Sequence, residues 1–143
     1  MNDVRSIPLG ACLLLAVTTA GAASHGRITI VTTGIEGTRG TVLVQLANSA
    51  ADYDSDDDAF RHAEGKPIDG RVTVVFDDVP YGDYAVKAFH DENDNKKIDI
   101  GWRGPKERYG FSNGARGFMG PPRFDEARFS LDRAELRVEI ELK

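Results

Sequence analysis

The sequence predicts a single antiparallel β-sandwich of about seven strands with one long irregular loop. Two observations carry this prediction. From residue 27 onward, apolar and polar residues alternate with a period of two in runs rich in β-branched and aromatic residues. No long stretch has the spacing of an amphipathic helix, and short strands without intervening helices are typical of a sandwich.

The first two strands are expected at residues 27–33 and 41–47. Gly34, Gly37 and Gly40 separate them, which predicts a hairpin connection. Residues 48–69 form a polar insertion, with an acidic run expected to be a solvated loop and a single helical turn expected at 59–64.

The remaining strands are expected at 71–76, 83–90, 127–131 and 135–142, with a turn at 77–82. Residues 83–90 are apolar on both faces, as in a central strand. The segment 91–123 is rich in glycine and proline, and irregular excursions of this length are typically functional.

The amino-terminal residues have the organisation of a signal peptide. Arg5 supplies a positive charge, residues 9–17 are apolar, and Ala20-Gly21-Ala22 is a small-residue cleavage motif. A membrane anchor is the alternative, but the apolar run is shorter than the roughly 18 residues that a span needs. We therefore expect residues 1–22 to be cleaved, residues 23–143 to form one domain without a membrane span, and the protein to be periplasmic or secreted.

Composition excludes several classes of chemistry. Cys12, the single cysteine, lies in the apolar run, so the mature chain has no disulfide, thiolate metal site or cysteine nucleophile. The net charge of −5 makes nucleic acid and anionic lipid poor partners and favours cations or a basic partner.

A candidate calcium loop follows the strand at 83–90. Oxygen-bearing side chains recur from Asp91 at its first, third, fifth and ninth positions, which is the spacing of EF-hand-type loops. Lys96 stands where glycine is usual, and Trp102 stands where a bidentate glutamate is usual. The candidate ligands are Asp91, Asn93, Asn95, Asp99, the carbonyl of Lys97, and Glu107 folding back. The alternative is an Asx-rich turn that needs no ion.

Aromatic residues gather in the same excursion, and two readings are open. Trp102, Tyr109 and Phe111 could contact a peptide or glycan, since flat rings stack well on such partners. Alternatively, these rings, with Phe118 and Phe124, could form a small core beneath the loop.

Catalysis has little support. His90 has no histidine at metal-ligand spacing, and the residues around Ser112 do not form a nucleophile elbow. We therefore expect that the protein is not an enzyme.

Three motifs resemble the bacterial DUF2141 family of uncharacterised exported proteins. They are the run from Gly82-Asp83-Tyr84-Ala85 through Asp91-Glu92-Asn93-Asp94-Asn95, the run Glu107-Arg108-Tyr109-Gly110-Phe111-Ser112-Asn113, and Gly120-Pro121-Pro122-Arg123-Phe124. The resemblance covers most of the mature chain and implies an immunoglobulin-like or transthyretin-like sandwich, similar also to collagen-adhesin B-type domains. It implies no activity, because the family has no assigned function.

The expected function is an exported, non-enzymatic β-sandwich module whose 91–99 loop is stabilised by calcium. The alternative is an extracytoplasmic domain that binds a peptide or glycan through the aromatic residues of its 102–124 loop. Its partner would be an unknown protein, peptide or glycan.

Overall fold

The computed structural model describes residues 24–143, so the predicted signal peptide lies outside the described residues. Three strands form the first sheet, in the order β10 (Glu135–Glu141), β1 (His25–Thr33) and β4 (Val72–Pro80). Strand β1 is antiparallel to β4 and parallel to β10. The first and last strands of the domain are therefore hydrogen-bonded neighbours.

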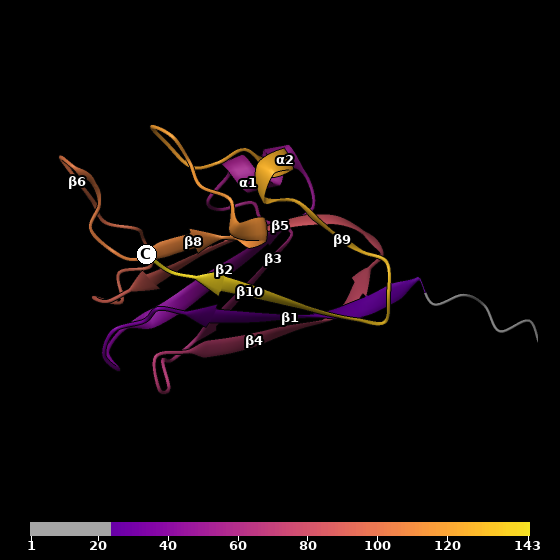
Figure 1. The fold of residues 1–143 in the computed structure, drawn as a ribbon, viewed down its shortest axis with the longest axis horizontal. Helices are drawn as coiled ribbons and strands as arrows, with labels where there is room; N and C mark the ends of the chain where they lie inside the picture. Colours follow the sequence, from indigo (N-terminus) through magenta and orange to yellow (C-terminus); the bar gives the residue numbers. More distant parts are fainter. Residues whose placement is uncertain (1–23) are drawn as a thin grey trace, which may run out of the picture.

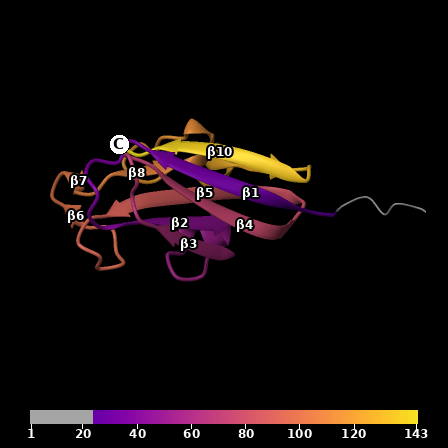
Figure 2. The same ribbon diagram turned by 90° about the horizontal axis from the view of Figure 1, so that it is seen from below.

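The second sheet has the order β3 (Arg61–Gly65), β2 (Thr41–Ala47), β5 (Gly82–Asp91) and β8 (Tyr109–Phe111), with β9 (Phe129–Leu131) also paired to β5. A small separate hairpin joins β6 (Ile100–Gly101) to β7 (Gly104–Pro105). The helical segments are α1 (Ala50–Asp54), the 3-10 turn η1 (Ser112–Gly114) and α2 (Phe124–Ala127). Figures 1 and 2 show the two main sheets as stacked layers, which confirms the predicted all-β sandwich.

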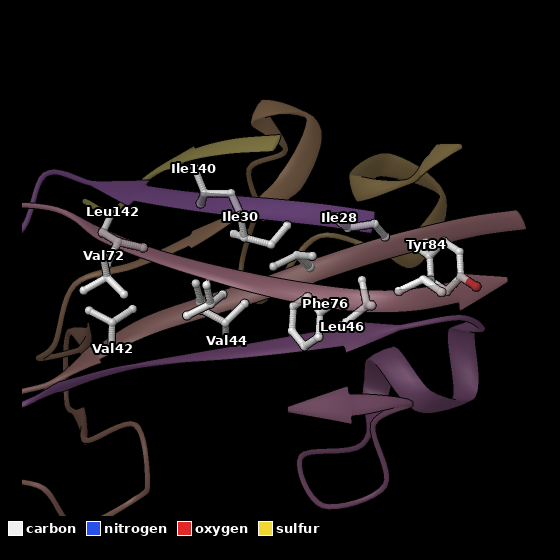
Figure 3. Packing of buried hydrophobic residues seen from close by; sticks show 14 of the residues in the cluster. Ile28, Ile30, Val42, Val44, Leu46, Val72, Phe76, Tyr84, Ile140 and Leu142 are labelled. Atoms are coloured by element: carbon white, nitrogen blue, oxygen red, sulfur yellow. The ribbon is translucent and has the colours of Figure 1, made fainter. Parts of the chain in front are cut away.

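The core lies between the two sheets (Figure 3). In β4 the burial alternates from Val72 to Asp77, and the buried side chains of this strand belong to the same core cluster as those of β2. Full burial of an aliphatic side chain contributes about 1.5–3 kcal/mol, so this layer is the main source of stability. Its buried members include Ile28, Ile30, Val42, Val44, Leu46, Val72, Val74, Phe76, Val86, Ile140 and Leu142.

A smaller cluster covers the outer face of the second sheet. Tyr53 from α1 and Ala127 from α2 pack against Ala47 and Ala85, with Phe111 and Phe124 partly buried beside them. The ring of Tyr53 makes an edge contact with that of Phe124, at 6.1 Å between centroids. Short helices thus cover the part of the sheet where the irregular excursion returns.

The predicted hairpin between the first two strands is wrong. Strands β1 and β2 belong to different sheets, so the glycine-rich connection crosses the sandwich. The turn between β4 and β5 also links the two sheets. A flexible connection permits either arrangement, and the choice depends on which strand offers a matching edge.

Two local predictions also fail. The expected helical turn at 59–64 is instead strand β3, which pairs with β2, while the helix of this insertion lies earlier at Ala50–Asp54. The expected turn at 77–82 is largely strand, because β4 continues to Pro80 alongside β1. Within residues 24–143 there are ten strands and not about seven, because the excursion contributes three short ones.

None of the helices in this part of the chain has the length and apolar character required to span a bilayer.

Candidate functional site

The candidate calcium loop begins at the last residue of β5. The side chain of Asp91 is fully buried and accepts hydrogen bonds from the backbone N–H groups of Asn95, at 3.1 Å, and Lys96, at 2.7 Å. These two bonds fold residues 91–96 into a closed turn. The Asp91 carboxylate is therefore the organising centre of the loop.

The amides of this loop converge on Asp99. Asn93 Nδ2 donates to Asp99 Oδ2 at 2.7 Å, and Asn95 Nδ2 donates to Asp99 Oδ1 at 3.0 Å. The amide oxygens of Asn93 and Asn95 accept from the backbone N–H groups of Asn95 and Lys97, respectively. Four of the predicted ligand side chains are thus held in one hydrogen-bonded network.

Glu107 folds back onto the loop, a possibility that the sequence left open. Its side chain is buried, with Oε1 accepting from the backbone N–H of Glu92 at 3.1 Å and Oε2 accepting from that of Asp99 at 3.0 Å. The Glu107 carboxylate therefore bridges the beginning and the end of the loop.

The connection between β1 and β2 also contacts this loop, and the sequence analysis did not predict that contact. His90 Nε2 lies 2.8 Å from the carbonyl oxygen of Arg39, so Nε2 carries the proton and donates. Gly40 has a positive φ of 78°, and a Cβ there would lie 2.3 Å from the carbonyl oxygen of Asp91. The backbones meet so closely that residue 40 has to be glycine.

Two charged residues extend the loop's contacts without being candidate ligands. Asp94 accepts from the hydroxyl of Thr41 at 2.5 Å and lies 3.4 Å from Lys66 Nζ, and both contacts lower the pKa of the Asp94 carboxyl. Lys96 Nζ lies 2.5 Å from Glu64 of β3, and this hydrogen bond raises the pKa of Lys96. Lys96 also adopts the positive φ, 64°, that glycine would adopt at the sixth position of a calcium loop.

The candidate calcium ligands are of different chemical kinds. Across residues 24–143 no three side chains of the His, Cys, Asp and Glu types are grouped tightly enough to hold a metal by themselves. A cation here would need the amide oxygens of Asn93 and Asn95 and a backbone carbonyl in addition to carboxylates. The structure presents amide nitrogens to Asp99, which is the arrangement of the Asx-rich turn, and oxygen ligation requires both amides to rotate.

The predicted aromatic ligands do not form one platform. Tyr109 and Phe111 lie on β8 in an edge contact, 5.6 Å between ring centroids, and line a groove of roughly 290 Å³ with residues of β10. Trp102 is absent from that groove and stands at the tip of the β6–β7 hairpin. Of the five rings predicted to gather, Phe111 and Phe124 help to cover the outer cluster, whereas Trp102 and Phe118 project into solvent.

The two residues considered for catalysis are buried. Ser112 Oγ accepts from the backbone N–H of Val86 at 2.8 Å and donates to the carbonyl oxygen of Ala127 at 2.6 Å. His90 is 1% exposed, and its Nδ1 has no hydrogen-bond partner within the described chain. Both side chains serve packing and backbone bonding, and neither lines the groove beside β8.

Comparison with known proteins gives one match. A family model described as an uncharacterized protein conserved in bacteria (DUF2141) matches residues 30–139. No curated protein and no solved structure matches the chain. The matched range includes the calcium-loop candidate, the whole second sheet, most of the first sheet, and the groove lining except Ile140, Glu141 and Lys143.

Proposed function

The chain belongs to the DUF2141 family of uncharacterised bacterial proteins, and on that premise we propose that it is an exported, non-enzymatic β-sandwich module whose loop at residues 91–99 binds calcium. Calcium would fix the start of the excursion that carries β6, β7 and β8. The ion would act as a structural staple that orders the loop behind it.

One observation carries this proposal. Asp91 and Glu107 are both buried, and neither has a basic side chain as an ion-pair partner among residues 24–143. A buried carboxylate without a countercharge loses several kcal/mol of hydration, and backbone N–H groups offset only part of that loss. A divalent cation supplies a countercharge in direct contact with these carboxylates, whereas the ammonium of Lys96 acts on Asp91 only from beyond ion-pair distance.

The ligands would come from side chains that the hydrogen bonds of the loop already link, and the carboxylates would have to close further around the ion. Asp91, Asp99 and Glu107 offer carboxylates, Asn93 and Asn95 offer amide oxygens once rotated, and Lys97 offers its backbone carbonyl. Calcium accepts six to eight oxygen ligands in flexible geometry, so this set is chemically suited to it. The positive φ at Lys96 supports the same reading, because the loop makes its sharp turn without glycine.

Calcium titration calorimetry and thermal melts test the proposal. We expect one-site binding, and calcium at about 100 times its Kd would add about 2.7 kcal/mol and raise Tm by roughly 10 °C relative to chelator. Asp99→Asn removes one carboxylate at a partly exposed position and should weaken calcium binding at least roughly tenfold.

The matched control is Asp57→Asn, the same substitution at an exposed position of the acidic run. It should leave calcium binding unchanged. Absence of binding heat, together with identical melting curves in calcium and chelator, would establish the loop as an Asx-rich turn and refute the calcium proposal.

Export and the absence of catalysis belong to the same proposal. The signal-peptide motif at residues 1–22 supports export, and the structural use of Ser112 and His90 supports a non-enzymatic role. Cell fractionation with mass spectrometry of the recovered protein tests export. Removal of residues up to Ala22 or Ala23, with recovery from the periplasm or medium, is expected, and an intact chain in the cytoplasm would contradict it.

The groove beside β8 supports a second candidate function, the binding of a peptide or glycan. Its lining includes the exposed Tyr109 and the half-buried Phe111, and Glu139, Glu141 and Lys143 supply polar groups. Tyr109→Ala should abolish retention on a peptide or glycan array, whereas Trp102→Ala, outside the groove, should not. Retention that is lost only with Trp102→Ala would exclude the groove as the site.

A further inference from the structure

The charge of the chain is unevenly distributed. Residues 96–123 contain seven basic and two acidic residues, a net charge of +5, whereas the rest of the chain has 11 basic and 21 acidic residues, a net charge of −10. Residues 96–123, the part of the excursion that follows the acidic start of the candidate calcium loop, are thus a basic segment on an acidic protein. The whole-chain charge conceals this separation.

Two turns in this basic segment share one pattern. They are Gly101-Trp102-Arg103-Gly104-Pro105 and Gly117-Phe118-Met119-Gly120-Pro121, each with two central residues between glycines and a proline after them. In the first, Gly101 pairs with Gly104, which places Trp102 and Arg103 at the tip of a two-residue hairpin loop. We call these segments the two tip turns.

The second tip turn is equally tight. A Cβ on Gly117 would lie 1.6 Å from the carbonyl oxygen of Gly120, so the turn closes only with glycine at position 117. Met119, one of its two central residues, has a positive φ of 58°. The backbone therefore holds Phe118 and Met119 at the apex.

The tip side chains are exposed. Trp102 is 88% exposed, Phe118 92% and Met119 94%. Five of the seven large hydrophobic residues exposed in residues 24–143 fall within 96–123, with Ile100 and Tyr109 completing the five. Exposed apolar residues concentrated in one segment indicate an interaction surface.

Basic side chains accompany both tips. The guanidinium of Arg103 lies 4.3 Å from the centroid of the Trp102 ring, and Lys106 and Arg116 are exposed nearby in sequence. In Figure 1 the β6 hairpin and the loop that leads from η1 to α2 rise from the same side of the molecule, away from the β1–β4–β10 sheet. The backbones of both tip turns thus project from one side of the molecule, with basic residues beside them in sequence.

We propose that the two tip turns dock the protein on the surface of an anionic lipid bilayer. Tryptophan, phenylalanine and methionine at the apices would enter the interfacial region, where aromatic rings are favoured, while the flanking arginines and lysines would pair with lipid phosphates. Two narrow projections suit a deformable bilayer better than a protein partner, whose interface is a continuous surface of about 800 Å² per side.

The acidic remainder of the chain does not prevent this docking. Charges are screened over about 8 Å at physiological ionic strength, so a basic segment in contact with lipid acts largely independently of distant carboxylates. This revises the expectation, drawn from net charge alone, that anionic lipid is a poor partner. The proposal is independent of calcium, and its test is performed in chelator.

Trp102 is the single tryptophan of the chain, so its fluorescence reports directly on one tip. The probe is vesicles containing phosphatidylglycerol, compared with vesicles of phosphatidylcholine alone, added to the full chain as recovered from a bacterial host. We expect the Trp102 emission to shift to shorter wavelength only with the anionic vesicles, and the shift to diminish as salt is raised.

Matched double variants separate the apolar and charged contributions. Phe118→Ala with Met119→Ala should weaken vesicle binding by about tenfold per side chain, whereas Ile68→Ala with Val75→Ala, at the other two exposed apolar positions, should not. Arg103→Gln with Arg116→Gln should weaken binding about fivefold per charge, whereas Arg133→Gln with Arg137→Gln should not.

Unchanged Trp102 emission with anionic vesicles at low salt would overturn the proposal. Equal losses of vesicle binding in the test and control variants would also overturn the proposal. The two tip turns would then contribute no more to vesicle binding than other exposed residues. If an acidic polypeptide shifted the Trp102 emission and vesicles did not, the bilayer proposal would be overturned. The basic segment would then be assigned to binding an acidic protein.

Discussion

At the scale of single residues, Ser112 shows how one hydroxyl joins three parts of the fold. Its Oγ links the backbone N–H of Val86 in β5 to the carbonyl oxygen of Ala127 in α2, and the side chain is fully buried. Ser112→Ala leaves both backbone groups without this partner. We expect the free energy of unfolding to fall by roughly 2–3 kcal/mol, measured by urea denaturation.

The control for Ser112 is Ser130→Ala, because Ser130 is exposed and donates only to the side chain of Asp83. It should cost less than about 0.5 kcal/mol. Equal losses from the two substitutions would show that the buried bonds of Ser112 contribute no special stability.

Asp94 predicts a pH dependence of stability. The Thr41 hydroxyl first, and then Lys66, lower the pKa of this carboxyl below its ordinary value of 3.8 in the folded protein. The resulting stabilisation is present above the unfolded-state pKa and is lost as pH falls through the folded-state pKa. In chelator, Tm of Asp94→Asn should lie below that of the native chain near neutral pH, and the two should converge below about pH 4.

Asp57→Asn is again the comparison, since that carboxylate is exposed and makes no ion pair within residues 24–143. Its melting curve should follow that of the native chain at every pH. A gap between Asp94→Asn and the native chain that persists into acid would refute the role given to the Asp94 carboxylate.

Lys96 marks a limit of residue patterns. The sequence rule asks for glycine at the sixth position of a calcium loop, yet Lys96 adopts the same left-handed backbone. Its ammonium group pairs with Glu64, 32 residues away. The backbone N–H of Lys96 donates to the Asp91 carboxylate within the loop, so a local hydrogen bond holds the turn, whereas the contact with Glu64 of β3 is one that local sequence could not predict.

At the scale of elements, the connection between β1 and β2 supports the candidate calcium loop. A Cβ at Gly40 would lie 2.3 Å from the Asp91 carbonyl oxygen and 2.7 Å from Cα of Glu92. Gly40→Ala should therefore push the connection away from the loop. We expect a loss of at least roughly 2 kcal/mol in unfolding free energy, measured by denaturant titration.

Gly37 provides the control for the same substitution. It has nearly the same φ, 77°, but a Cβ there has nothing within 4 Å. Gly37→Ala should introduce backbone strain alone and lower the free energy of unfolding by roughly 1 kcal/mol. Similar losses at both positions would mean that strain, and not the approach to Asp91, determines the cost.

The elements that the sequence misplaced lie where tertiary pairing overrides local preference. Residues 61–65 carry no strand pattern, yet they are strand β3 because β2 offers them a free edge. Similarly, Asp77 and Asp78 look like a turn, but they form an irregularity within β4, where the register with β1 shifts, and the backbone carbonyls of both accept hydrogen bonds from Arg61. Partners distant in sequence determined these assignments.

At the scale of the whole molecule, the parallel pairing of β1 with β10 ties the beginning of the described fold to its end. Seven residue pairs join them, from Arg27 with Glu135 to Thr33 with Glu141. Leu142 follows β10 and is buried in the common core. Leu142→Ala should therefore destabilise the entire sandwich by roughly 2–5 kcal/mol in one cooperative transition, measured by calorimetry.

Val75→Ala is the corresponding control, because Val75 is an exposed residue on β4. Val75→Ala should change the free energy of unfolding by less than about 0.5 kcal/mol. Two separate transitions in Leu142→Ala, one for each sheet, would contradict the single cooperative core.

The sequence by itself determined the all-β class, the alternation in β1, β2 and β4, the central position of β5 and the family. These features depend on period-two burial and on contiguous motifs, which are local properties of a chain. The spacing of oxygen-bearing side chains also singled out the loop from Asp91 to Asp99 as a candidate site, whereas the return of Glu107 to that loop was left open.

Only the tertiary structure decided that β1 and β2 belong to different sheets and that β10 lies parallel to β1. The contacts of Gly40 and Thr41 with the candidate calcium loop were likewise visible only in the folded structure. It also separated the aromatic residues into buried rings and two exposed tips. The physical reason is that pairing partners and solvent exposure depend on contacts between residues far apart in the chain, which no local pattern records.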